Sequence, residues 1–273
     1  MRCQSLSLIL LFVCSTASAQ SQQSDEALLA KTRALYDAPF SRDLVSFDCA
    51  VQFDWKKHIL DTLGAIPPAA LPTAERLQTL QHRVFVDHLG AVVSEIPRTT
   101  DLSNSPHEID LEESLKSIVS SGLNAWLPFG TNVILPVKPT KFHFQMADAG
   151  YKLEMSGSGV EATLNLVPDL RITNVVSQLP QPLRFATEFI TGPDGYLLQS
   201  VKTSSTIGSE GDWDAKFAYT YKAVQQFQLP STITVTQPTN EAWRYTLSDC
   251  KLVTGISLEV EAPKHESPQR RIP

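Results

Sequence analysis

The chain has 273 residues, and its 29 aspartates and glutamates outnumber its 23 lysines and arginines, which gives a formal net charge of −6. Proteins that bind nucleic acid neutralise phosphates with a basic surface, and no basic stripe exists here, so we expect no nucleic-acid partner. A chain of about 250 residues after processing is long enough to bury a sizeable core in one large β-rich domain or two small ones.

The first residues have the pattern of an export signal. An arginine is followed by a short apolar core and then by Ala17-Ser18-Ala19, which matches a small-x-small cleavage pattern. We therefore expect residues 1–19 to be a signal peptide that is cut before Gln20. An N-terminal anchor helix is disfavoured because polar residues follow at once, and acylation of Cys14 is disfavoured because Val13 precedes it. No later segment is apolar enough to cross a membrane.

Removal of the signal leaves two of the four cysteines. Cys3 and Cys14 leave with it, whereas Cys49 and Cys250 remain. An even pair in an exported chain favours a disulfide, and closing a loop of about 200 residues would contribute about 5 kcal/mol in the chain-entropy model. The alternative is two buried free thiols packed as small apolar groups. Two cysteines without close histidines make a poor metal site.

The first elements predicted after the signal are a helix and a strand. Residues 25–37 carry leucines at helical spacing. Residues 44–55 alternate apolar and polar side chains, with Val45, Cys49 and Trp55 on the apolar face. This period of two predicts a strand that is buried on one face, with the Cys49 sulfur pointing inward.

The next segments are a connection, a strand pair and a loop. Residues 64–73 are rich in proline and predict a connection. Within residues 76–96 we expect two strands that turn near Gly90, with a helix possible before them. Residues 97–109 are polar and predict a long loop.

The strongest helix pattern follows this loop. Asp110 is placed to cap a helix, and Glu113 completes an Asp-x-x-Glu capping box. Leu115 and Trp126 belong to an apolar stripe on one face, and Pro128 is expected to end the helix. An amphipathic helix between β segments needs a sheet to cover.

From Lys138 onward the chain is almost entirely strand, with short turns between segments of alternating polarity. Phe142, Phe144 and Met146 share one face, for example. The pattern predicts an antiparallel meander, because the apolar runs typical of parallel strands are absent.

The predicted fold class is therefore α+β and mostly antiparallel β, a curved half-barrel-like meander covered by a few helices. Residues 20–261 would form a single domain, and the polar residues 262–273 a disordered tail.

A large antiparallel sheet must curl, and few helices are available to fill it. A curled sheet that is not filled encloses an apolar cavity that suits lipids. The alternative is that the same side chains fill a dry core. The candidate cavity-lining residues are Phe142, Phe144, Tyr151, Leu153, Phe185, Phe217, Tyr219, Tyr221 and Trp243.

One segment resembles a known family. FAYTYKAVQQFQLPSTITV has a strand of alternating aromatics, a short turn and a strand that opens with Leu-Pro; the residues concerned are Phe217, Tyr219, Tyr221, Phe227, Leu229, Pro230, Ile233 and Val235. With the hairpin of residues 151–177 and the order of elements over residues 25–255, it resembles the periplasmic lipoprotein-carrier superfamily, the LolA/LolB-like half-barrels. The resemblance implies an unclosed barrel, helices as a lid and a cavity for acyl chains. The family's carrier residues match no position here, and insertions around 64–110 depart from its compact pattern.

No catalytic motif accompanies this pattern. His82 and His88 lie about 20 Å apart along an extended strand, too far to share one metal. Asp212 and Asp214 are spaced to hold Ca²⁺, but such a pair is more often a solvated loop. We expect no catalytic residue, no metal and no cofactor. A hydrolase whose residues converge only in three dimensions stays an alternative.

The first functional hypothesis is therefore an exported, periplasmic or extracellular carrier that binds a lipid or an acylated protein in its apolar cavity. The second is a structural or interaction protein of the cell envelope, with a dry core and a sheet edge that engages another envelope protein.

Overall fold

The computed structural model describes residues 25–95, 106–135, 141–157, 160–177, 183–205, 213–239 and 242–255. The predicted signal peptide, the tail, Asp212 and most of the predicted polar loop lie outside these residues, and the expectations about them stay predictions.

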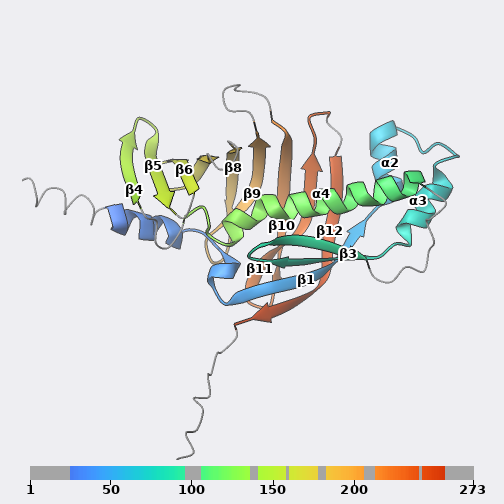
Figure 1. The fold of residues 1–273 in the computed structure, drawn as a ribbon, viewed down its shortest axis with the longest axis horizontal. Helices are drawn as coiled ribbons and strands as arrows, with labels where there is room; N and C mark the ends of the chain where they lie inside the picture. The colour runs from blue at the N-terminus through green and yellow to red at the C-terminus, as the bar shows by residue number, and fades with distance from the viewer. Residues whose placement is uncertain are drawn as a thin grey trace, which may run out of the picture.

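Twelve strands form one antiparallel sheet in the order β3-β2-β1-β12-β11-β10-β9-β8-β7-β6-β5-β4 (Figure 1). The sheet does not close, because β3 and β4 are its two ends. This confirms the predicted α+β half-barrel class. The strands are β1 (Leu44–Phe53), β2 (His82–Asp87), β3 (Gly90–Glu95), β4 (Lys141–Ala147), β5 (Gly150–Gly157), β6 (Val160–Leu166), β7 (Ile172–Ser177), β8 (Leu183–Thr191), β9 (Tyr196–Ser204), β10 (Ala215–Val224), β11 (Phe227–Thr236) and β12 (Ala242–Thr254).

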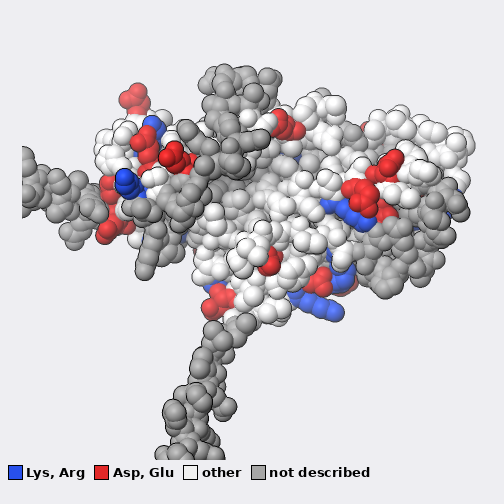
Figure 2. All heavy atoms as spheres, in the orientation of Figure 1, with Lys and Arg blue, Asp and Glu red and all other residues white. Residues whose placement is uncertain are grey.

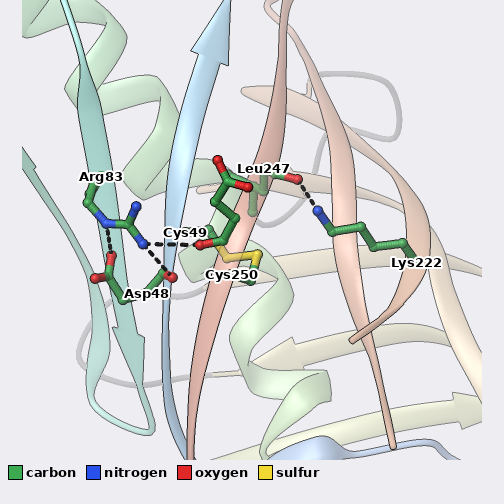
Figure 3. The surroundings of a disulfide bond; sticks show 7 residues. Asp48, Cys49, Arg83, Lys222, Leu247 and Cys250 are labelled. Carbon is green, nitrogen blue, oxygen red and sulfur yellow. Dashed lines mark hydrogen bonds and ion pairs between the residues drawn. A yellow bond between two sulfur atoms is a disulfide. The ribbon is translucent and has the colours of Figure 1, made fainter. Parts of the chain in front are cut away.

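The predicted disulfide joins the first strand to the last. Cys49 of β1 and Cys250 of β12 are 201 residues apart in the chain, and their Cα atoms are 4.1 Å apart (Figure 3). The register between the two strands shifts here, and Asp249 has a φ of 46°. Arg83 of β2 donates to the Asp48 carboxylate and to the backbone carbonyls of Asp48 and Asp249. The bridge therefore fixes a bulge between β1 and β12, the third and fourth strands from the β3 edge of the sheet.

Helix α4 (Pro106–Gly130) runs across one face of the sheet (Figure 1). The predicted apolar stripe is confirmed, because Leu115 and Trp126 are buried. The predicted bounds are wrong: the helix begins four residues before Asp110, and Pro128 lies inside it. Proline is tolerated at a first helical position, and near the end Pro128 removes only one backbone donor.

Two further helices, α2 (Trp55–Leu63) and α3 (Leu71–Gln78), lie between β1 and β2. The sequence predicted that the strand would extend to Trp55, and it gave no prediction for the residues of α2 that follow. Instead, the Asp54 carboxylate accepts from the Lys57 backbone N–H and caps α2. Helix α3 corresponds to the helix that was considered before the strand pair, and the turn near Gly90 is confirmed.

Two side chains that the sequence placed on the apolar face of a strand are exposed instead. Val45 is exposed, because a register shift between Leu44 and Ser46 turns Leu44 inward in its place. Met146 is 87% exposed, although Phe144 of the same strand is buried. It lies near the turn at the free end of the sheet, on the edge strand β4.

Each edge strand has one backbone donor occupied by a helix side chain. The Ala91 N–H of β3 donates to Asn124 Oδ1 of α4 at 3.0 Å. The Phe144 N–H of β4 donates at 3.2 Å to Asp25 Oδ2 of the N-terminal helix, residues 25–34. Such contacts oppose pairing with another chain at these positions.

Candidate functional site

Helix α4 packs directly on the face of the sheet that carries the predicted cavity residues. The Tyr219 hydroxyl donates to the Gly122 carbonyl at 2.9 Å, and the Tyr245 hydroxyl donates to the Val119 carbonyl at 3.1 Å. Burial raises the pKa of both phenols well above the ordinary value. Farther along α4, the Phe129 ring lies edge-on to Phe185.

The nine candidate residues all belong to the hydrophobic core of the molecule or pack against it. Three of them, Phe142, Tyr151 and Tyr221, are half-buried. The remaining six are buried, namely Phe144, Leu153, Phe185, Phe217, Tyr219 and Trp243. The structure thus brings them to one face, and their role as ligand contacts stays a prediction.

A cleft of about 900 Å³ opens beside this core, where β1 and β12 meet α2, α3 and the first half of α4. Its size is in the range of pockets that hold small apolar ligands. Its lining residues are Ala50, Val51, Gln52, Phe53, Asp54, Trp55, Lys56, Lys57, His58, Asp61, Leu77, Gln78, Leu80, Gln81, His82, Leu115, Ala242, Arg244, Thr246 and Asp249.

None of the nine candidates is among them. Phe142 instead lines a hollow of about 360 Å³ on β4–β6, and Trp243 lines one of about 700 Å³ beside α4.

Four elements supply large apolar side chains to the cleft. Phe53 and Trp55 come from the corner between β1 and α2, Leu77 from α3 and Leu115 from α4. The Gln78 side chain holds this corner, because its Oε1 accepts from the Trp55 N–H at 3.1 Å and its Nε2 donates to the Phe53 carbonyl at 3.0 Å. A single amide therefore fixes α3 against the end of β1.

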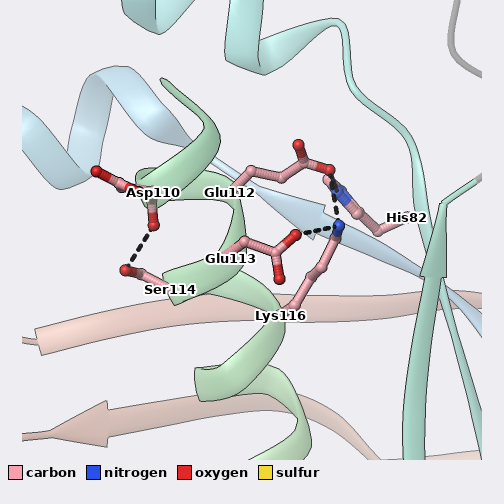
Figure 4. Close-up of polar contacts among 6 residues, drawn as sticks. All are labelled: His82, Asp110, Glu112, Glu113, Ser114 and Lys116. Atoms are coloured by element: carbon pink, nitrogen blue, oxygen red, sulfur yellow. Dashed lines mark hydrogen bonds and ion pairs between the residues drawn. The ribbon is translucent and has the colours of Figure 1, made fainter. Parts of the chain in front are cut away.

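A buried polar cluster includes His82, which also lines the cleft (Figure 4). His82 Nε2 is 3.0 Å from Glu112 Oε1, and both side chains are at most 3% exposed. Lys116 lies 3.2 Å from the same carboxylate and 2.8 Å from Glu113. Removing one partner of a buried charged group is costly, so these contacts tie the first half of α4 to β2.

In the outer part of the cleft, lysine side chains are paired with carboxylates. Lys56 pairs with Glu75 at 3.0 Å and Lys57 with Asp61 at 2.8 Å. On the α4 side of the molecule, the residues drawn in colour show small separate groups of charge (Figure 2). The cleft thus combines apolar and polar lining residues with a low net charge, which suits an amphipathic ligand better than a highly charged one.

Sequence reasoning missed most of the residues that form this cleft. Phe53 and Trp55 were assigned to a strand face, and Leu115 to a helix stripe, but neither pattern shows that they meet. The available signal was Asp54, which is a good N-cap directly before Trp55. Leu77 had no comparable signal.

Among the described residues, no group of three or more histidine, cysteine, aspartate or glutamate side chains is placed to hold a metal ion. The same part of the chain contains no helix with the length and apolar character needed to cross a membrane.

Comparison with solved structures finds a LolA superfamily protein. This protein, from Nitrosomonas europaea, shares 10% identity with the chain, over 84% of this chain and 94% of its own, with a TM-score of 0.25. No family model matches the chain. The comparison with curated proteins finds no match.

Proposed function

We propose that the protein is an exported binding protein of the cell envelope that holds the acyl chains of a lipid or of a lipid-modified partner. The observation that carries the proposal is the cleft of about 900 Å³ beside the half-barrel core, with Phe53, Trp55, Leu77 and Leu115 in its lining. Burial of each methylene would contribute about 0.8 kcal/mol, so binding would depend on chain length more than on the head group.

Export is supported by two features. The sequence begins with the pattern of a signal peptide, and the Cys49–Cys250 disulfide is a bond that persists in oxidising compartments. A mature mass that begins at Gln20 would support this part of the proposal. A mass that retains residues 1–19 would contradict it.

The ligand can be tested with a fluorescent fatty acid as the probe. Leu80 is half-buried, packs against the core and lines the cleft, so Leu80→Asp places a charge in the cleft at a position that is not fully buried. We expect the variant to bind the probe at least tenfold more weakly. Leu89→Asp is the matched control, because Leu89 is 82% exposed at a distant turn. Equal binding by Leu80→Asp and the wild type would contradict the cleft as the site.

Tyr219→Asp and Phe144→Asp do not test ligand binding cleanly. Tyr219 is buried and bonded to α4, and Phe144 is 8% exposed, so a buried charge at either position would destabilise the whole fold.

A second candidate function is an interaction protein with a dry core. The observation that favours it is that six of the nine candidate cavity residues are buried within the protein itself. In that case the probe would not bind the wild type, and the protein would purify without lipid. We propose a binding role, not a catalytic one, in both cases.

A further inference from the structure

The outer face of the sheet carries a group of cations that the acyl-binding role does not use. Arg184 of β8, Lys202 of β9 and Lys216 of β10 lie beside the buried residues Phe185, Val201 and Phe217 in the sequence. Because successive side chains on a strand point to opposite faces, the three cations project away from the core. They form a basic patch on three adjacent strands of a protein whose net charge is −6.

The pairing inside this basic patch is unfavourable for the fold. Lys202 and Lys216 are direct cross-strand partners, and like charges in that position destabilise a sheet. Two other cations of the sheet do have carboxylate partners, namely Arg83 with Asp48 and Lys152 with Glu154. Among the ion pairs of the described residues, none involves a member of the basic patch.

The nearest carboxylates on this part of the sheet have other partners. Glu188 accepts from the Ser200 hydroxyl at 2.7 Å, and Asp214 accepts from the Ser205 N–H at 2.6 Å. These hydrogen bonds leave both carboxylates charged, but neither carboxylate forms an ion pair with the three cations, which outnumber them.

An aromatic ring lies among these cations. The Arg184 guanidinium carbon is 5.2 Å from the Trp213 ring centroid, and the Lys202 ammonium is 5.8 Å from it. Trp213 is half-buried, whereas Trp55, Trp126 and Trp243 are at most 5% exposed. A tryptophan beside lysine and arginine is the combination that settles at the headgroup level of a membrane.

We propose that Arg184, Lys202, Lys216 and Trp213 form a docking surface for a membrane that displays anionic phospholipid headgroups. An open face fits an extended array of phosphates better than a single enclosed anion, and none of the three clefts described above includes these residues. The cations attract the anionic surface, and the indole enters the headgroup region. Because the chain as a whole has a net charge of −6, the face that carries the three cations is the one expected to turn toward an anionic surface.

Co-sedimentation with vesicles tests this surface. The wild type is expected to bind vesicles of phosphatidylcholine mixed with phosphatidylglycerol, and not vesicles of phosphatidylcholine alone. Added salt should weaken binding, because the attraction is electrostatic. Lys202→Gln combined with Lys216→Gln should weaken binding roughly 30-fold, given the contribution of each cation near an anionic surface. The double variant should melt no lower than the wild type, because it removes a repulsive pair.

The matched control is Lys31→Gln combined with Lys141→Gln, which removes the same charge from exposed positions outside the basic patch. This control should bind the mixed vesicles like the wild type. Trp213 supplies a second readout, since its emission should shift to shorter wavelength when the mixed vesicles are added. Trp213→Phe should abolish that shift.

Three results would overturn the proposal. The first is no preference for the anionic vesicles, and the second is equal loss of binding in the control. The third is displacement by inorganic phosphate at low concentration, which would indicate a site for a small anion. The proposal does not rest on the acyl-binding cleft, and Leu80→Asp should bind the vesicles normally even if that cleft holds no ligand.

Discussion

Glu112 of α4 and His82 of β2 are in contact at 3.0 Å inside the protein, where the Glu112 side chain has no exposed area. Glu113, its neighbour in the chain, is 62% exposed and pairs with Lys116 at the surface. Two adjacent glutamates on one helix therefore have very different roles. Glu112 joins α4 to the sheet through His82, whereas Glu113 lies on the outside.

Glu112→Ala should lower the free energy of unfolding by about 3 kcal/mol, because it leaves buried polar partners without their carboxylate. Glu113→Ala should change it by less than about 1 kcal/mol, as expected for an exposed pair. Urea unfolding of the two variants measures the difference. Equal effects would show that the buried contact does not hold α4.

Gly122→Ala should destabilise the protein by about 1–3 kcal/mol through overpacking. A Cβ at this position would meet the Tyr245 hydroxyl and the Ile233 side chain, so α4 would have to move away from the sheet. Ser121→Ala, at the exposed neighbouring position, should leave the melting temperature nearly unchanged. If both variants melt like the wild type, the close approach of α4 at Gly122 is not required.

Cys49→Ser combined with Cys250→Ser should lower the free energy of unfolding by about 2–5 kcal/mol, because the bridge closes a long loop in the unfolded chain. A reducing agent present during unfolding should lower the urea midpoint of the wild type to that of the double variant. The double variant itself should not respond to the reducing agent. A wild type that is insensitive to reduction would contradict a stabilising bridge.

Four of the six tyrosines should ionise only when the protein unfolds. Desolvation raises the pKa of Tyr36, Tyr219, Tyr221 and Tyr245 in the folded state above the ordinary value near 10. Above that pH the folded protein holds protons that the unfolded chain releases, so stability should fall as the pH rises. Absorbance at 295 nm should show at most two tyrosines ionising before unfolding begins. Ionisation of all six with the fold intact would contradict this burial.

Local patterns were sufficient to predict most strands and the buried stripe of α4. The period of two was clear in the meander, and Leu115 and Trp126 were recognised at helical spacing. Trp55 was misassigned because an apolar residue there fits both the end of a strand and the start of a helix. The start of α4 was misplaced at Asp110 for a similar reason. The Asp-x-x-Glu pattern there is typical of a helix start, although it lies four residues inside the helix.

The cleft depends on contacts that no local pattern encodes. Glu108 and Glu112 have the sequence character of surface residues, yet both are buried, because Arg76 and His82 reach them from other elements. The pairing of β1 with β12 was indicated only by the two cysteines. Residues that form a site through such distant contacts could not be selected from alternation and spacing alone.

The most direct test of the central proposal is native mass spectrometry of the protein exported to an oxidising periplasm, followed by lipid extraction. We predict a mature chain that begins at Gln20, two hydrogens lighter than its reduced form, with an additional bound mass of acyl-chain size that Leu80→Asp loses. A bare protein with no extractable lipid would contradict the carrier role and favour the interaction protein with a dry core.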